Sequence, residues 1–235
     1  TAAECSCVAD QYVRDYVADS TKKYAGTSCT DLADCKTKCS ADASCEGYAK
    51  SFKGMSKDQI ISNHRRLTVC VVLQSGKINC VGEGSYGELG NGATSDSTTP
   101  VEVSGITNAV SVGAGYDHAC ALLADGKVNC WGRNFRGALG NGGTSNSNTP
   151  VEVSGITTAI GVSSGYWFSC AVLSDGKVNC WGWNGQGQLG DDSWSQQNTP
   201  VEVSGITNAI QVSCGGTFAC ALLSDGKVNC WGNNP

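Results

Sequence analysis

A period of 50 residues constrains this chain more than any other feature of its sequence. The run HACALLADGKVNCWG at 118–132 returns as FSCAVLSDGKVNCWG at 168–182 and as FACALLSDGKVNCWG at 218–232. A fourth, more divergent copy, TVCVVLQSGKINCVG, occupies 68–82. Repetition at this spacing indicates that one supersecondary unit is reused along the chain.

Each repeat contains four short segments that are typical of strands and are bounded by Gly, Asn, Asp or Pro. In the second repeat these segments are AVSV from 109, ACALL from 119, KVNCW from 127 and PVEV from 150, here named strands A to D. Four short strands in about 50 residues suit a propeller blade better than a solenoid coil. The predicted fold class is therefore mainly β, with about four propeller-type blades in an open or shared ring.

The hairpin between strands B and C can be registered from the sequence. If Cys120 lies opposite Cys130, Leu123 faces Lys127 and the loop 124–126 ends on the glycine that such a loop requires. Opposed strand residues share a face and approach within disulfide distance. Reduced core thiols are the alternative to the four predicted bridges, which are Cys70–Cys80, Cys120–Cys130, Cys170–Cys180 and Cys220–Cys230.

Composition indicates where the protein works. Fifteen cysteines in 235 residues favour an oxidising compartment, because the reducing cytosol disfavours disulfides. The sequence therefore predicts a secreted, extracellular protein. No apolar run approaches the roughly 20 residues of a membrane span. Residues 67–235 carry 6 Lys+Arg against 12 Asp+Glu, and this acidic balance disfavours nucleic acid as a partner.

Three repeated motifs carry a family resemblance: CALLSDGKVNCWG, WGRNFRGALGNG and TPVEVSGIT. Together they resemble regulator of chromosome condensation repeats of the secreted, cysteine-paired kind, over residues 67–235. The resemblance implies a β-propeller of four-stranded blades. The founding member exchanges guanine nucleotide on a nuclear GTPase through a loop wedge and a basic face that this sequence lacks. Exchange activity would therefore be carried over by fold analogy alone.

The repeats stop short of the ring that the resemblance implies. The first copy has a degenerate strand A, and the blades span 59–104, 109–154 and 159–204, with a fourth that begins at 209 and lacks strand D. Uncovered strand edges invite pairing with other polypeptides. Three solutions are open: four blades close alone, residues 1–58 cover an open end, or copies of the chain cap one another.

Residues 1–58 are predicted to form a small, disulfide-rich, partly helical segment. One stretch has apolar residues at helical spacing, namely Val8, Tyr12, Val13, Tyr16 and Val17. The run DCKTKCSADASCEGYA resembles part of a PAN/apple module over residues 29–48, a class that binds proteins or glycans outside cells. A generic cysteine-stapled helical cap is the alternative for this segment.

One cysteine is left over when the pairs are counted. Six in the first segment are expected to form disulfides rather than to bind zinc, because no Cys-x-x-Cys pair occurs: Cys5, Cys7, Cys29, Cys35, Cys39 and Cys45. Cys214 is the odd thiol, and Ser164 and Ala114 hold its place in sister repeats. It is an inert thiol, a nucleophile, or a partner of an amino-terminal cysteine. We expect the last, as a lock within or between chains.

No catalytic, cofactor-binding or metal-binding constellation emerges. The glycine-rich GEGSYGELGNG belongs to the repeat and not to a strand-to-helix phosphate loop. The sequence predicts a non-enzymatic, secreted structural protein that self-assembles into an extracellular fibre, appendage or matrix through its incomplete propeller ends. The alternative is an extracellular module that binds glycans or proteins, with Trp194 as a sugar-stacking candidate. A guanine-nucleotide-exchange regulator is the third hypothesis.

Overall fold

The computed structural model describes residues 60–62 and 68–233. The chain divides into two units, Thr1–Lys57 and Asp58–Pro235, and all described residues belong to the second. The helices, six cysteines and apple-like stretch predicted for residues 1–58 lie outside the described residues. Within the described ranges there are 15 strands in four antiparallel sheets and no helix. The mainly β fold class is therefore confirmed.

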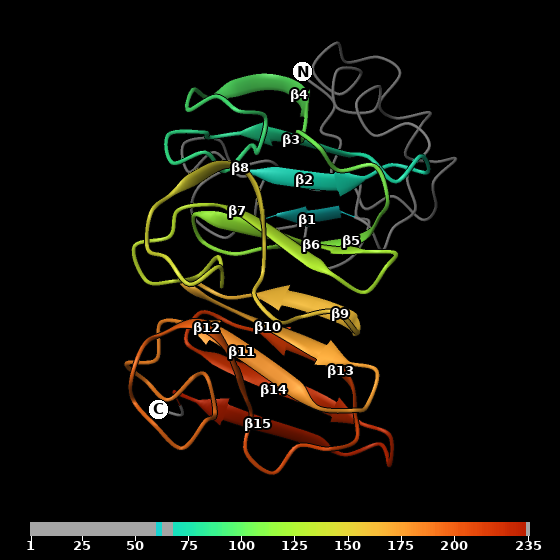
Figure 1. Ribbon diagram of the computed structural model, residues 1–235, viewed down its shortest axis with the longest axis vertical. Coiled ribbons are helices and arrows are strands. Elements are labelled where there is room, and N and C mark those ends of the chain that lie inside the picture. The colour runs from blue at the N-terminus through green and yellow to red at the C-terminus, as the bar shows by residue number, and fades with distance from the viewer. Residues whose placement is uncertain (1–59, 63–67, 234–235) are drawn as a thin grey trace, which may run out of the picture. The chain divides into compact units, whose positions relative to one another are not determined.

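Each sheet is one repeat, and its strands follow chain order. The sheets succeed one another along the chain (Figure 1). Blade one comprises β1 (Ile60–Ser62), β2 (Val69–Val72), β3 (Ile78–Gly82) and β4 (Ser97–Glu102). Blade two comprises β5 (Ala109–Ala114), β6 (His118–Leu123), β7 (Val128–Gly132) and β8 (Ser147–Glu152). Blade three comprises β9 (Ala159–Ser164), β10 (Phe168–Leu173), β11 (Val178–Gly182) and β12 (Gln197–Glu202). Blade four comprises β13 (Ala209–Cys214), β14 (Phe218–Leu223) and β15 (Val228–Gly232).

The hairpin between the second and third strands has the register expected from the sequence. Cys120 lies opposite Cys130, and the Leu123 amide donates to the Lys127 carbonyl over 2.9 Å. Gly126 takes a φ of 79°, a left-handed conformation that glycine adopts without a Cβ penalty. The opposed pair forms a disulfide in every blade, with Cα atoms 4.0–4.1 Å apart: Cys70–Cys80, Cys120–Cys130, Cys170–Cys180 and Cys220–Cys230.

The outer strand differs from the prediction at its start. The sequence predicted a strand from Pro150, whereas β8 begins at Ser147 and ends at Glu152. The pairing register between β8 and β7 shifts between Cys130 and Gly132, at a β-bulge or similar irregularity. Because β8 stays paired on the far side of this irregularity, it starts three residues before Pro150. Proline is tolerated there because β8 is the last strand of its sheet, and an edge strand needs no ladder donor on its open side.

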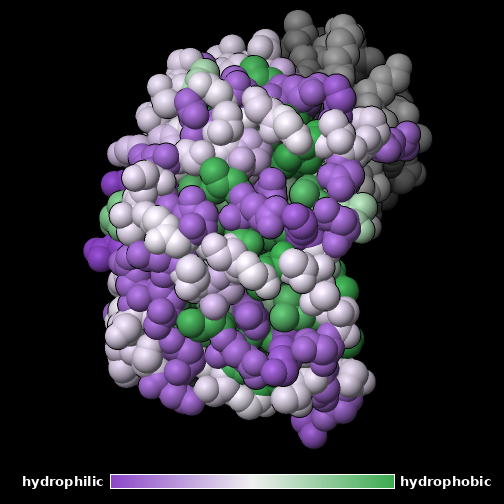
Figure 2. Space-filling model, in the orientation of Figure 1, coloured by the Kyte–Doolittle hydropathy of each residue, from purple (hydrophilic) through white to green (hydrophobic). Residues whose placement is uncertain are grey.

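The hydrophobic core lies between neighbouring blades. Each blade presents its cystine, with valine and leucine side chains, to the blade that follows. Between blades two and three, Val128 and the Cys120–Cys130 bridge pack against Ala171 and Trp181, all fully buried. Equivalent clusters join blades one and two and blades three and four. In Figure 2, accordingly, polar residues cover much of the surface in view and apolar residues emerge in separate patches.

A tryptophan at the end of the third strand joins each blade to the one before it. The Trp181 indole Nε1 donates to the Ala138 carbonyl over 2.8 Å. Trp131 and Trp231 make the matching bonds to the preceding blades, over 2.8 and 2.9 Å. A buried indole N–H needs a hydrogen-bond acceptor. Each of these bonds therefore holds the third strand of one blade at a defined position against the preceding blade.

Candidate functional site

Blade four presents an uncovered face that its sister blades bury. We name it the blade-four face, and its residues lie on one side of β14 and β15: Phe218, Cys220, Leu222, Val228 and Cys230. Val228 is 60% exposed, whereas Val128 and Val178 are fully buried. Phe218 is 45% exposed, whereas Phe168 has no exposed surface. An apolar surface of this kind marks an interaction site.

The same blade has an open strand edge. In blades one to three the third strand pairs with strands on both sides, whereas the sheet of blade four has the order β13-β14-β15. A groove of about 490 Å³ runs beside this edge. Its lining combines the β15 residues Asn229, Cys230 and Trp231 with blade-three residues that include Gly187, Trp194 and Val203.

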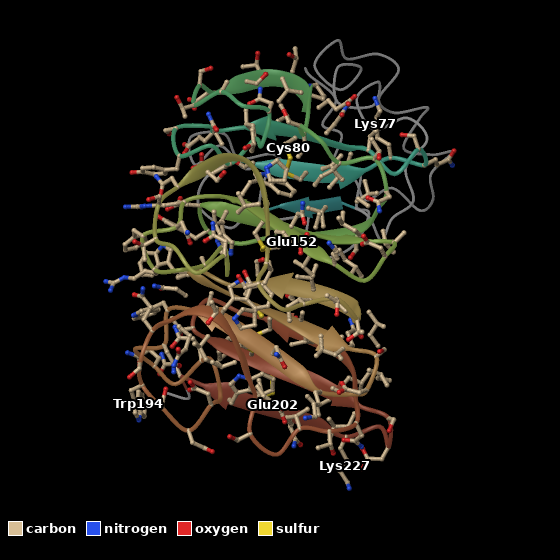
Figure 3. All side chains as sticks on the ribbon, viewed as in Figure 1. Lys77, Cys80, Glu152, Trp194, Glu202 and Lys227 are labelled. Atoms are coloured by element: carbon tan, nitrogen blue, oxygen red, sulfur yellow. A yellow bond between two sulfur atoms is a disulfide. The ribbon has the colours of Figure 1, made fainter. Side chains whose placement is uncertain are left out.

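Trp194, the ligand-binding candidate of the sequence, lies at this groove. Its side chain is 73% exposed and packs beside Gly187. Figure 3 shows Trp194 and Lys227 near opposite ends of β15. The sister positions hold Thr94 and Thr144, so blade three alone has an exposed indole at this place.

Cys214 is expected to bond to an amino-terminal cysteine of its own or another chain, and those cysteines lie outside the described residues. It is a free, half-buried thiol in the structure. Its Sγ lies 3.4 Å from the Ser163 carbonyl oxygen, and its amide donates to the Ser163 hydroxyl over 3.0 Å. Burial raises the pKa of this thiol to about 12, so it stays protonated near neutral pH and is a poor nucleophile. The interaction that the structure gives Cys214 is packing between β13 and β9, and an interchain bond stays a prediction.

His118 is a packing residue and not part of a site open to solvent. Its side chain is buried, and Nε2 lies 2.8 Å from the Ser169 hydroxyl of the next blade. Burial lowers the pKa of His118 to about 4, so the ring is neutral near neutral pH. Without access to a substrate, the His118–Ser169 pair has no catalytic use.

Aromatic side chains from blades one to three gather at one end of the sheets. We name this group the aromatic surface: Tyr86, Tyr116, Phe135, Tyr166, Trp167 and Trp183. The Trp167 ring lies 5.5 Å from the rings of both Phe135 and Trp183. The Arg133 guanidinium lies 4.3 Å from the centre of the Tyr86 ring and pairs with buried Asp117 over 3.0 Å. This surface could not be predicted from the sequence, because its members come from different blades.

Other kinds of site find no support in the described part of the chain. Residues 60–62 and 68–233 hold no group of three or more His, Cys, Asp or Glu placed to bind a metal ion. Nor do these ranges contain a helix with the length and apolar character to cross a bilayer. The candidate site is therefore the blade-four face with its adjoining edge and groove.

Comparison with known families agrees with this architecture. A family model described as the regulator of chromosome condensation (RCC1) repeat matches residues 75–122, 125–172 and 175–222, and a second model of the same description matches 109–138 and 159–188. The chain belongs to the regulator of chromosome condensation repeat family. In these RCC1 repeats the matched segments run from one hairpin loop to the next, so each spans the junction between two blades. No curated protein matches the chain.

Three solved structures are similar to this chain over about 70% of its length. Human WBSCR16 is 27% identical with a TM-score of 0.64, and the match covers 70% of this chain and 44% of that one. Yeast RCC1 (Prp20) bound to Kap60 is 18% identical with a TM-score of 0.61, covering 70% and 41%. Prp20p from Saccharomyces cerevisiae is 22% identical with a TM-score of 0.60, covering 69% and 42%. This RCC1-repeat chain therefore matches less than half the length of these structures.

Proposed function

We propose that this protein is a non-enzymatic, secreted structural protein whose copies assemble through the blade-four face. The observation that carries the proposal is the exposure of Phe218 and Val228, whose sister residues are fully buried between blades. Burying an exposed valine or phenylalanine contributes about 1.5–3 kcal/mol. Four disulfides in the described blades support an extracellular location.

The chemistry of the blades favours pairing of two blade-four faces over a head-to-tail contact. Inside the array, the face of one blade packs on the alanines and tryptophan of the next. In blade one, the positions of Ala119, Ala121 and Trp131 hold Val69, Val71 and Val81. Blade one therefore lacks the small side chains and the indole that this face meets elsewhere. A twofold contact between like faces needs no such surface.

The mass of the protein in solution tests the pairing. We expect sedimentation velocity to give twice the 24.2 kDa chain mass at micromolar concentration. Val228→Asp places a carboxylate at the centre of the contact and should return the protein to a monomer. Because Val228 is already exposed, the variant should fold.

Ile160→Asp is the matched control, since Ile160 is 53% exposed on another part of the array. It should leave the paired mass unchanged. A monomeric wild type at all concentrations, or equal loss of pairing in both variants, contradicts the proposal. Growth into a fibre, appendage or matrix needs a second contact on each copy, and negative-stain imaging would detect it as ordered polymers.

The aromatic surface supports a second candidate, the binding of glycans or proteins. Trp, Tyr and Arg dominate the energetics of many interfaces, and Phe135 is 37% exposed beside Arg133 and Arg136. A glycan array probed with wild type and with Phe135→Ala tests this role, and binding that the variant loses would support it. The yeast Prp20 structures, below 25% identity, give no ground for guanine-nucleotide exchange.

A further inference from the structure

The aromatic surface contains a continuous row of side chains that crosses three blades. The Arg133 guanidinium lies between two rings, 4.3 Å from the centre of Tyr86 and 4.4 Å from the centre of Phe135. The row continues from Phe135 to Trp167 and from Trp167 to Trp183, with ring centres 5.5 Å apart at each step. Loops of blades one, two and three therefore form one surface, and none of its members belongs to blade four.

The rings of this row stand steeply against one another. The plane of the Trp167 ring makes an angle of 78° with Phe135 and of 72° with Trp183. Tyr116 contacts the same indole at 84°. Adjacent rings therefore present edges and faces in alternation, and not the flat platform on which a nucleic-acid base stacks. Such a ridged surface favours a ligand that has ridges of its own.

The hydrogen-bonding groups that this surface leaves unused can all donate. Among the described residues, no hydrogen-bond partner lies at the hydroxyls of Tyr116 and Tyr166 or at the Trp183 indole. An indole N–H only donates, and a tyrosine hydroxyl donates as well as accepts. A ligand rich in hydrogen-bond acceptors therefore matches these groups.

Arg136 adds an unpaired positive charge to the surface. It is exposed, its guanidinium lies 5.0 Å from the centre of the Phe135 ring, and no carboxylate of a described residue lies within ion-pair distance of it. Arg133, in contrast, pairs with Asp117 over 3.0 Å. These two are the only arginines of residues 67–235, a segment with 12 Asp+Glu. Because a guanidinium matches the geometry of a carboxylate, Arg136 favours a ligand with an acidic group.

We propose that the aromatic surface binds a proline-rich polypeptide segment in the polyproline II conformation, with an acidic residue against Arg136. The proposal rests on the second candidate function, binding through the aromatic surface, and names its ligand. Proline has no N–H, and a polyproline II segment makes no internal hydrogen bonds, so its carbonyls are free acceptors. Its proline rings pack against aromatic side chains. A glycan matches the surface less well, because each sugar hydroxyl brings a donor as well as an acceptor.

A synthetic peptide tests the proposal. The probe is EPPEPPEPPEPP with blocked ends, titrated into the 235-residue chain. We expect saturable binding by calorimetry and a change in tryptophan fluorescence, because the peptide itself contains no chromophore. The peptide EGSEGSEGSEGS has the same length and charge but is a flexible coil, so it should bind at least about tenfold more weakly. The peptide KPPKPPKPPKPP keeps the conformation and reverses the charge, and it should bind a few-fold more weakly than the probe.

A variant of Phe135 locates the site. Phe135→Ser introduces the residue that blade one has at this place, Ser85. It should weaken binding of the probe at least about tenfold, because it removes a ring that the peptide covers. Because Phe135 is already 37% exposed, the variant should fold. Ile160→Ser is the matched control, since it removes an exposed apolar side chain at the start of β9, whereas Tyr166 follows the end of that strand.

A variant of Arg136 tests the acidic residue of the ligand. Arg136→Gln introduces the residue of blade three, Gln186. It should weaken binding of EPPEPPEPPEPP a few-fold, since exposed ion pairs contribute little, and it should abolish the preference over KPPKPPKPPKPP. Lys127→Gln is the matched control, because it removes the same charge from the hairpin turn at the other end of blade two, and it should leave peptide binding unchanged.

Three results would overturn the proposal: no saturation by EPPEPPEPPEPP up to about 1 mM, equal binding of EGSEGSEGSEGS, or equal effects of Phe135→Ser and Ile160→Ser. The same samples are titrated with polygalacturonic acid, an acidic glycan without proline. If this glycan binds, Phe135→Ser loses it and the probe does not bind, the aromatic surface is a binding site but the proline-rich ligand is wrong. If neither ligand binds, both the ligand and the second candidate function are contradicted.

Discussion

The His118–Ser169 pair shows how a single polar contact replaces an apolar one at a blade junction. Phe168 occupies the matching position at the next junction, where the residue facing it from blade four is Ala219. At the junction of blades two and three, His118 is buried against the Ser169 hydroxyl at 2.8 Å. The two facing positions therefore change together, from His with Ser at one junction to Phe with Ala at the next. Such a joint change is expected, because a buried polar side chain needs a hydrogen-bond partner.

Protonation of His118 should reduce stability in acid. Burial holds the folded pKa at about 4, below the ordinary value of 6.5, so the unfolded chain takes up the proton more readily. The contribution of neutral His118 to the free energy of unfolding is complete above pH 6.5. It declines as the pH falls towards 4, by up to about 3 kcal/mol. Urea unfolding at pH 7.5 and 4.5 measures it. His118→Phe with Ser169→Ala, the pair of the next junction, should lose this part of the pH dependence. An equal acid sensitivity in both proteins would contradict the assignment.

Cys214 should react slowly in the native protein. Its half-buried thiol has a pKa raised to about 12 by burial, so little thiolate forms near neutral pH. Iodoacetamide followed by peptide mapping should label Cys214 in urea much faster than under native conditions. Cys214→Ser, which introduces the residue of blade three, should leave the mass on a non-reducing gel unchanged. If the wild type forms a covalent dimer and this variant does not, Cys214 forms the interchain disulfide that the sequence predicted.

At the level of elements, the tryptophan bonds connect neighbouring blades, whereas each surface ion pair lies within a single blade. Trp181 is fully buried and its indole donates to the Ala138 carbonyl, whereas the Lys177–Glu202 pair is about half exposed. Exposed pairs contribute at most about 1 kcal/mol. The three-dimensional order of the blades therefore depends on the indole contacts and the apolar junctions.

Replacing the tryptophan of the third strand by phenylalanine should lower the free energy of unfolding more in blade three than in blade four, whose face is uncovered. Trp181→Phe removes a buried hydrogen bond and leaves a cavity, so we expect a loss of about 2–3 kcal/mol in the free energy of unfolding. Trp231→Phe should cost less, since Trp231 is only partly buried and borders the open groove. Chemical denaturation of both variants measures the difference. Equal losses would show that the groove is filled in solution.

The sequence predicted the elements where local chemistry determines them. The position of Gly126 determines the hairpin loop, and the loop determines which cysteines face each other. The start of β8 could not be predicted in the same way, because it depends on the register shift between Cys130 and Gly132. Val228 and the buried Val178 have identical side chains, so the exposure of Val228 depends on its place in the last described blade and not on its residue type.

At the scale of the whole molecule, the described blades form a linear series in which each blade contacts its neighbours. Stability in such a series is the sum of blade and junction contributions. Blade four has one junction, while blades two and three have two each. The repeat period predicted this architecture, but the aromatic surface could not be predicted, because it forms only when loops of three blades meet.

Amide hydrogen exchange should be faster in blade four than in blades two and three, because blade four has fewer neighbouring strands and junctions. Amides of β15 should exchange at least about tenfold faster than those of β7 and β11, which are paired on both sides. Mass spectrometry of peptic fragments measures this difference. Uniform protection across the three strands would contradict the linear series.

Because the three junctions share a cystine-bearing face, alanines and an indole, such a chain can change in length by whole blades. Every junction joins a cystine-bearing face to alanines and one indole, so a blade copied by gene duplication meets surfaces that already fit it. Insertion or loss of one 50-residue unit therefore requires few compensating substitutions in the units that remain, and the His118–Ser169 contact is a place where both sides must match. Relatives of this protein can differ by whole blades while the sequence of each blade stays nearly constant.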